Sequence, residues 1–128
     1  MVKFSADRRT LLGAGWDGRL ALWDVPHRKL RGVVRAHNNS FACGVISPDG
    51  QTIATGGDDL TVRLWNSTQC QELAVLHDNA YLVRAVAFSR DGHWLASGSA
   101  DGHVQLRYAP LWTEIATRER PPKAKGAL

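Results

Sequence analysis

The chain has 128 residues, of which 44% are hydrophobic and 22% charged; this is ordinary globular usage and excludes a disordered or membrane-embedded chain as a whole. The formal net charge of +4 is concentrated at the ends: residues 1–36 hold eight Lys and Arg against three Asp and Glu, residues 37–117 four against eight, and residues 118–128 four against one. No apolar run approaches the roughly 20 residues of a bilayer span, and the two cysteines form no disulfide framework, so we expect a cytoplasmic chain without membrane anchor or signal peptide.

A repeat of 42 residues organises the chain. The pairs Phe4-Ser5, Ile46-Ser47 and Phe88-Ser89 are spaced by this step. The same step relates further apolar and turn positions: Leu11, Ile53 and Leu95; Asp17, Asp59 and Asp101; Leu22, Leu64 and Leu106. Each unit has short apolar runs separated by turns of Asp and Gly, which predicts β-hairpins rather than helices. The units are 1–36, 37–76 and 77–117.

The first unit, 1–36, begins late. Met1 aligns with Cys43 and Ala85, so the chain enters this unit in the middle of its first strand. We therefore expect a truncated first strand here, and complete sets of strands in the units that follow.

The middle unit, 37–76, shows the pattern most fully. Its apolar runs predict strands at 41–46, 52–56, 61–65 and 71–76, and Pro48-Asp49-Gly50 is a turn between the first two because Pro pre-sets φ and Gly accepts a positive φ. Four antiparallel strands in about 42 residues is the dimension of one blade of a β-propeller.

The third unit, 77–117, is followed by a basic segment. Glu114-Ile115-Ala116 matches Glu72-Leu73-Ala74 by the 42-residue step, so the segment 111–120 is predicted as the fourth strand rather than a helix. Residues 118–128, rich in Lys, Arg and Pro, are predicted to be a flexible tail.

Three segments of this sequence resemble WD40 repeats: FSADRRTLLGAGWDGRLALWD (4–24), ISPDGQTIATGGDDLTVRLWN (46–66) and FSRDGHWLASGSADGHVQLRY (88–108). The segment 101–115 is also similar to the closing segment of bacterial WD40 chains. The resemblance implies an all-β fold with three four-stranded antiparallel blades of a propeller. Propellers close with four to eight blades, so we expect either the C-terminal part of a larger propeller or a partial one that completes its ring by self-association.

The resemblance also implies a buried hydrogen-bond network of His, Ser or Thr, Asp and Trp in each blade. The middle unit has the full set: His37, Thr55, Asp59 and Trp65. The third unit offers Ser97 and Asp101, with His77 two residues farther from its strand and Arg107 in place of Trp. The first unit has Asp17 and Trp23, with Gly13 at the hydroxyl position.

One aromatic residue stands outside this structural pattern. Trp16 precedes the turn Asp at a position where the other units have Asp58 and Ala100, so the blade does not require it. In WD40 proteins this turn lies on a face commonly used for partners, and exposed Trp, Tyr and Arg are typical interface anchors. The predicted interaction face therefore comprises these residues: Trp16, Phe41, Asp58, Tyr81 and Arg84.

The predicted function is a non-catalytic scaffold for protein partners, with no catalytic residue, metal or cofactor. A structural role is favoured over a nucleophilic triad for Thr55, His37 and Asp59. A metal site at His93 and His103 would lack a third ligand. The alternative is a basic nucleic-acid-associated module, which the tail suggests but which lacks an aromatic residue after Trp112 for stacking on bases.

Overall fold

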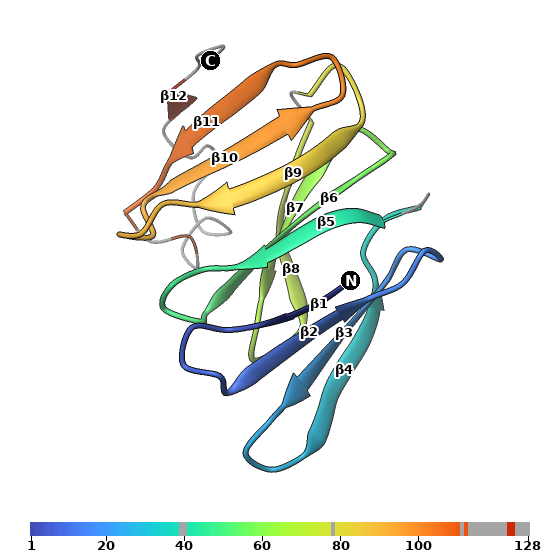
Figure 1. The fold of residues 1–128 in the computed structure, drawn as a ribbon, viewed down its shortest axis with the longest axis vertical. Coiled ribbons are helices and arrows are strands. Elements are labelled where there is room, and N and C mark those ends of the chain that lie inside the picture. Colours follow the sequence, from blue (N-terminus) through green and yellow to red (C-terminus); the bar gives the residue numbers. More distant parts are fainter. Residues whose placement is uncertain (39–40, 78, 111, 113–122, 125–128) are drawn as a thin grey trace.

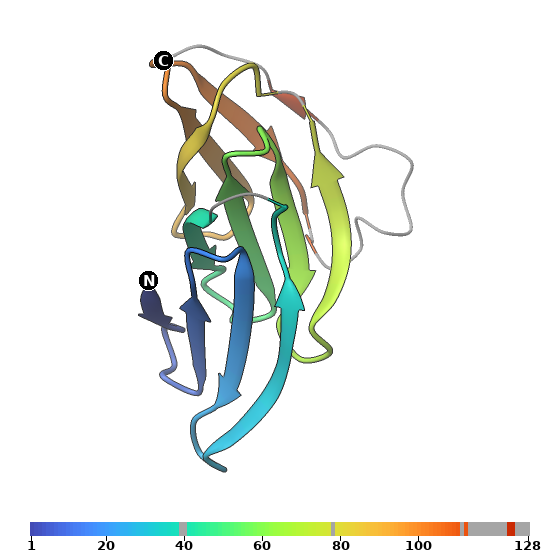
Figure 2. The same ribbon diagram turned by 90° about the vertical axis from the view of Figure 1, so that its right-hand side faces the viewer.

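The computed structural model describes residues 1–38, 41–77, 79–110, 112 and 123–124, and these form three four-stranded antiparallel sheets (Figure 1). No α-helix occurs in these ranges. The predicted all-β fold is therefore confirmed. Figures 1 and 2 show the three sheets following one another along the longest axis, each a blade in the sense expected from the sequence.

Each blade takes its strands from consecutive parts of the chain. Blade 1 consists of β1 (Val2–Phe4), β2 (Thr10–Ala14), β3 (Arg19–Asp24) and β4 (Lys29–Arg35). Blade 2 consists of β5 (Phe41–Ile46), β6 (Thr52–Gly57), β7 (Val62–Asn66) and β8 (Gln71–Leu76). Blade 3 consists of β9 (Val83–Phe88), β10 (Trp94–Ser99), β11 (Val104–Tyr108) and β12 (Lys123–Ala124).

The first turn of every blade uses the same hydrogen-bonding device. In blade 2 the Ser47 hydroxyl donates to Asp49 Oδ1 at 2.5 Å and accepts from the Thr52 N–H at 3.0 Å, which fixes the hairpin between β5 and β6. Gly50 supplies the positive φ of 75° that this turn needs. Ser5 with Asp7 and Ser89 with Asp91 repeat the arrangement in the other two blades.

The core lies between the blades rather than within any one of them. Blades 1 and 2 share the cluster Leu12, Leu20, Leu22, Ala36, Ile53 and Trp65. Blades 2 and 3 share a larger cluster that includes Ala54, Val62, Leu64, Val86 and Leu95. Alternating residues along each strand point to opposite faces, so an inner blade is apolar on both faces and needs a neighbour on each side.

The fourth strand of blade 3 differs from its predicted place. Apart from Trp112, which lies in a single 3₁₀ position, the predicted strand at 111–120 is outside the described residues. The strand that pairs with β11 is β12, in which Lys123 lies opposite Arg107 and Ala124 opposite Leu106. These two residues come from the segment predicted to be a tail; the rest of 118–128 is outside the described residues.

Candidate interaction surface on the turn face

A chain of buried hydrogen bonds crosses blade 2. The Trp65 indole N–H donates to Thr55 Oγ1 at 3.0 Å, Thr55 Oγ1 lies 2.9 Å from His37 Nε2, and His37 Nδ1 lies 2.9 Å from Asp59 Oδ1. His37 and Thr55 are 1% and 0% exposed. The four residues that the middle unit offers for a network are therefore in hydrogen-bond contact.

The charges of this network follow from burial and pairing. Burial lowers the pKa of His37 against the opposing hydrogen bond to Asp59, so the imidazole is neutral at pH 7. Burial opposes ionisation of Asp59, but hydrogen bonds from Thr61 and His37 outweigh it and lower the pKa of this carboxyl. An ionised carboxylate can only accept, so His37 Nδ1 carries the proton, and Nε2 accepts from the Thr55 hydroxyl.

The network holds the β6–β7 turn in place. Asp59 accepts the Thr61 backbone N–H at 3.2 Å and the Thr61 hydroxyl at 2.7 Å, and the Leu60 N–H donates to the Gly57 carbonyl at 3.3 Å. This turn, 57–60, and the equivalent turns 15–18 and 99–102 lie at the same end of the three sheets. We call this end the turn face.

In blade 3 the imidazole position is taken by a different residue from the one predicted. Asn79 Oδ1, not His77, accepts from the Ser97 hydroxyl at 3.2 Å, and His77 is exposed. Counting 42 residues from His37 leads to Asn79, so the backbone register fixes the position. Arg107 Nη1 donates to Ser97 Oγ at 3.3 Å, and burial lowers the pKa of Arg107 to about 10.

Asp101 and the two predicted network residues of blade 1 are placed elsewhere. Asp101 accepts from the Ser99 hydroxyl at 2.5 Å and pairs with His103 at 2.9 Å, within its own turn. Asp17 accepts the Arg19 N–H at 3.1 Å in an exposed turn. Trp23 is 41% exposed, and Gly13 leaves no hydroxyl to receive its indole N–H.

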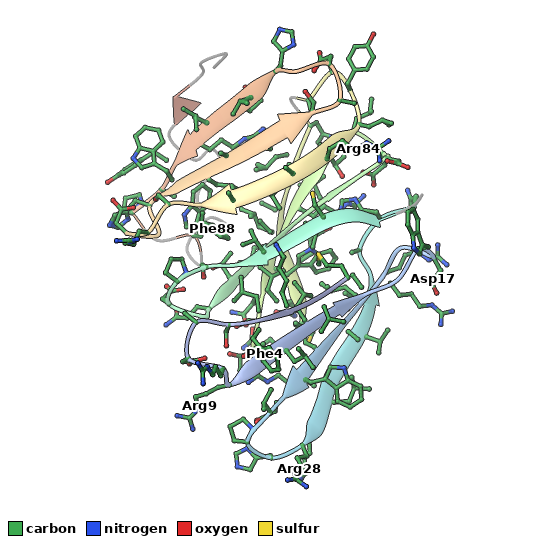
Figure 3. The ribbon with its side chains drawn as sticks, in the orientation of Figure 1. Phe4, Arg9, Asp17, Arg28, Arg84 and Phe88 are labelled. Atoms are coloured by element: carbon green, nitrogen blue, oxygen red, sulfur yellow. The ribbon has the colours of Figure 1, made fainter. Side chains whose placement is uncertain are left out.

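Four of the five predicted interaction residues present side chains on or near the turn face. Trp16 is 87% exposed at the tip of the β2–β3 turn, and Tyr81 is 56% exposed in the loop before β9. Arg84 Nη1 pairs with Asp58 Oδ1 at 3.1 Å, which joins blade 3 to the β6–β7 turn of blade 2. In Figure 3 the labelled Asp17 and Arg84 project from this side, opposite Arg9 and Phe88.

Phe41, the remaining predicted interaction residue, begins β5 with its backbone opposite Gly57. Its side chain is outside the described part of the structure. The face is therefore built here from Trp16, Asp58, Tyr81 and Arg84.

Leu60 is a turn-face residue that the sequence did not single out. It is 38% exposed and has a φ of +68°, in the left-handed region that favours glycine. The 42-residue step places it with Gly18 and Gly102, which have positive φ values in the equivalent turns. That mismatch in the repeat is the signal by which the sequence could have identified it, because the equivalent turns have glycine where φ is positive.

Other chemistry has little support in this arrangement. Thr55, the hydroxyl of the Thr–His–Asp set, is fully buried, so no substrate reaches it. Burial raises the pKa of the Cys43 thiol to about 11 and raises that of Cys70, so neither thiol is activated. Among the described residues, no three His, Cys, Asp or Glu side chains are grouped to hold a metal ion, and no helix is long and apolar enough to span a bilayer.

Comparison with known proteins gives three concordant findings. The sequence profile of the family described as "WD domain, G-beta repeat" matches residues 1–24, 28–66 and 70–106. Protein groucho of Drosophila melanogaster is 32% identical over 84% of this chain and 15% of its own length. Small ribosomal subunit protein RACK1y of Oryza sativa subsp. japonica is 33% identical over 98% of this chain and 37% of its own length.

Solved structures show the same architecture. The RRP9 WD40 repeats superpose with a TM-score of 0.79 at 25% identity, covering 84% of this chain and 34% of that one. U3-55K gives a TM-score of 0.79 at 24% identity over 84% of this chain and 35% of the other. The chain thus spans about a third of the length of these structures and less than two fifths of either relative.

Proposed function

This chain belongs to the WD40 repeat family, and from that premise we propose that it is a non-catalytic scaffold that binds protein partners through the turn face. WD40 repeats generally serve protein interaction, and nothing in the buried network calls for chemistry on a substrate. The observation that carries the proposal is Trp16, a large apolar side chain held almost wholly in water at a turn where the blade does not need it.

The surroundings of Trp16 supply the rest of an interface. Trp and Tyr side chains are enriched at protein interfaces and at binding hot spots. Trp16 and Tyr81 provide apolar area, and the Arg84–Asp58 pair provides a polar element on the same face. The backbone beneath is rigid, since the Gly18 carbonyl accepts the Ala36 N–H at 2.8 Å and the Leu82 carbonyl the Ala100 N–H at 2.9 Å. A rigid surface loses little conformational freedom when a partner binds.

The proposal has two further parts. A second copy of the chain is a proposed partner, because in the described part of the structure one apolar sheet face of blade 1 and one of blade 3 have no neighbouring sheet. We also propose a cytoplasmic location, for which the support is that Cys43 and Cys70 are both free thiols.

Capture of partners by the immobilised chain tests the main proposal. Wild-type protein is expected to retain a defined set of proteins, and Trp16→Ala to retain less than about a tenth as much of at least one of them. The matched control is Arg9→Ala, which removes another exposed side chain of blade 1, at the end opposite the turn face and outside the apolar faces of blades 1 and 3. Equal retention by wild type and Trp16→Ala would count against the turn face.

Two other functions predict different results. A nucleic-acid-associated module would retain RNA or DNA, and the retention would fall steeply with salt and with removal of residues 118–128. An enzyme would show a turnover that Thr55→Ala abolishes while the variant remains folded. Either outcome would overturn the scaffold proposal.

A further inference from the structure

The face of blade 1 that points away from blade 2 is a continuous apolar surface open to water. Val2 is 69% exposed and Phe4 60% exposed, and Trp23, Leu30 and Val33 are exposed as well. The register places these side chains on one face, since Val2 pairs with Gly13, Phe4 with Leu11, and Leu11 with Trp23. An apolar surface of this kind marks an interaction site.

The same three residues occur on blade 3, where they are covered. A step of twice 42 residues carries Val2, Phe4 and Leu11 to Val86, Phe88 and Leu95, and the residue type is identical at each position. Their cross-strand register is also the same, with Phe88 opposite Leu95 and Val86 opposite Ser97. Figure 3 labels Phe4 and Phe88 on their two blades. Val86 is 9% and Leu95 0% exposed, because blade 2 packs against this face.

The residues of blade 2 that cover this face are likewise repeated. Ala54, Val62 and Leu64, all fully buried, belong to the cluster shared with blade 3. One step of 42 residues carries them to Ala96, Val104 and Leu106, again with identical residue types. These three lie on the face of blade 3 that points away from blade 2, and each is only partly buried.

From this identity we infer that a second copy of the chain docks head to tail, the open face of its blade 3 covering the open face of blade 1. Blade 1 repeats one half of the blade 2–blade 3 interface and blade 3 repeats the other half. A contact between unlike faces repeats until it closes. Two copies of three blades make a ring of six, within the range of closed propellers. This inference gives the self-association part of the proposed function its faces and its register.

A second feature of the two faces fits the same docking. Trp94 and Tyr108 lie on the open face of blade 3 with ring centroids 5.3 Å apart, and Trp94 is 37% exposed. Blade 1 has a hollow of about 300 Å³ lined by Phe4, Leu11, Trp23, Asp24, Val25 and Arg28. Twice 42 residues relates Asp24 to Tyr108, so the aromatic pair and the hollow lie at the same end of their sheets. In the docked dimer, the Trp94 and Tyr108 side chains of one copy would therefore fill the hollow on blade 1 of the other.

The mass of the purified chain in solution tests the inference first. Light scattering during gel filtration is expected to give about 28 kDa, twice the 14.1 kDa of one chain. A mass of one chain would overturn the inference, because the two faces would then not be covered by a second copy. A ladder of larger species would also overturn it, because head-to-tail contacts would then fail to close.

Two variants then test which faces meet. Phe4→Asp breaks the blade 1 face and Leu106→Asp breaks the blade 3 face, and each variant alone is expected to be monomeric. A one-to-one mixture retains one intact contact, between blade 3 of the first variant and blade 1 of the second, so it is expected to form a heterodimer. Recovery of this dimer also shows that both variants are folded. If either variant alone stays dimeric, or the mixture stays monomeric, head-to-tail docking is contradicted.

The turn-face variant separates this inference from the scaffold proposal. Trp16→Ala is expected to keep the dimer mass while losing partner capture, since Trp16 lies on neither open face. If Trp16→Ala loses neither, the scaffold proposal fails while the dimer stands. If the wild-type chain is a monomer but Trp16→Ala still loses capture, the docking inference fails alone.

Discussion

The indole N–H of Trp65 donates to the hydroxyl of Thr55 at 3.0 Å, and both side chains are buried between blades 1 and 2. Trp65→Phe keeps a ring but removes this bond, and it leaves a void where the larger ring was. We expect the free energy of unfolding to fall by about 2 kcal/mol, from the lost hydrogen bond and the cavity together. Urea denaturation followed by circular dichroism measures it.

The matched control for Trp65→Phe is Trp23→Phe. Trp23 occupies the equivalent position in blade 1, is 41% exposed, and has no hydrogen-bond partner for its indole N–H among the described residues. Both variants are compared in the Leu106→Asp background, which is expected to be monomeric and so leaves Trp23 exposed; there the loss from Trp23→Phe is expected to stay below about 1 kcal/mol. Equal losses for the two variants would mean that the Thr55 bond contributes nothing.

Gly57 is packed against the imidazole of His37. A Cβ at position 57 would lie 2.6 Å from His37 Cγ and Nδ1, and the ring cannot retreat because Thr55 and Asp59 hold its two nitrogens. Gly57→Ala is therefore expected to lower the free energy of unfolding by about 2 kcal/mol or more.

Gly13 provides the comparison for Gly57. A Cβ there meets no atom within 4 Å, and Gly13→Ala restricts the unfolded chain, so we expect a gain of up to about 1 kcal/mol. Thermal unfolding of both variants measures the difference. A loss in Gly13→Ala as large as in Gly57→Ala would show that the contact with His37 is not the cause.

Blade 2 is the part of the fold that the sequence predicts best. Strands predicted at 41–46, 52–56, 61–65 and 71–76 appear as β5 to β8 with bounds that differ by no more than one residue. The reason is that a turn of Asp and Gly is a local signal, because the residues that form the turn directly follow the end of the strand. The fourth strand of blade 3 lacks such a signal, and β12 lies beyond the predicted segment.

The sequence predicts the residues of the candidate site less well than it predicts blade 2. The side-chain chemistry favoured His77, but the register brings Asn79 to Ser97, because position in the sheet and not residue type decides which side chains meet. Leu60 differs from Gly18 and Gly102 in the repeat, but its positive φ is known only from the structure. Likewise, the match between the open and the buried faces is recognised only once the packing of the blades is known. Contacts between residues far apart in the sequence cannot be predicted from a short segment of it.

Acid is expected to destabilise the protein through His37. Because burial lowers its pKa below the ordinary 6.5, the unfolded chain binds a proton that the folded chain does not, and stability falls as the pH drops below 6.5. Asp59, with its own pKa lowered below 3.8, adds a further loss at lower pH, when protonation removes the acceptor. Urea midpoints from about pH 7.5 down to about pH 5.5 measure the slope due to His37.

The controls for this pH dependence are two substitutions to Gln. His37→Gln removes the titrating group, so its urea midpoint is expected to be lower but flat across the same range. His77→Gln alters an exposed imidazole and is expected to keep the wild-type slope. A wild-type slope that survives in His37→Gln would assign the effect to other groups.

Leu60 is expected to show a conflict between stability and binding. Its φ of +68° destabilises the folded chain by about 1 kcal/mol, a strain that glycine would not have. Leu60→Gly relieves this strain, but the greater freedom of glycine in the unfolded chain offsets part of the stability gained. Leu60→Gly should therefore be as stable as wild type or more so by up to about 1 kcal/mol, yet bind a turn-face partner more weakly. Leu60→Ala, which keeps the strain, separates the two effects. A large loss of stability in Leu60→Gly would contradict this account.

The affinity of the chain for a partner recovered by capture tests the turn face most directly. Titration calorimetry with wild type and Trp16→Ala, at one salt concentration, gives the two dissociation constants. The account predicts a value at least about tenfold weaker for Trp16→Ala, equivalent to about 1.4 kcal/mol, with an unchanged unfolding free energy because this side chain is 87% exposed. Equal dissociation constants for the two proteins would contradict the central claim that Trp16 anchors a binding surface.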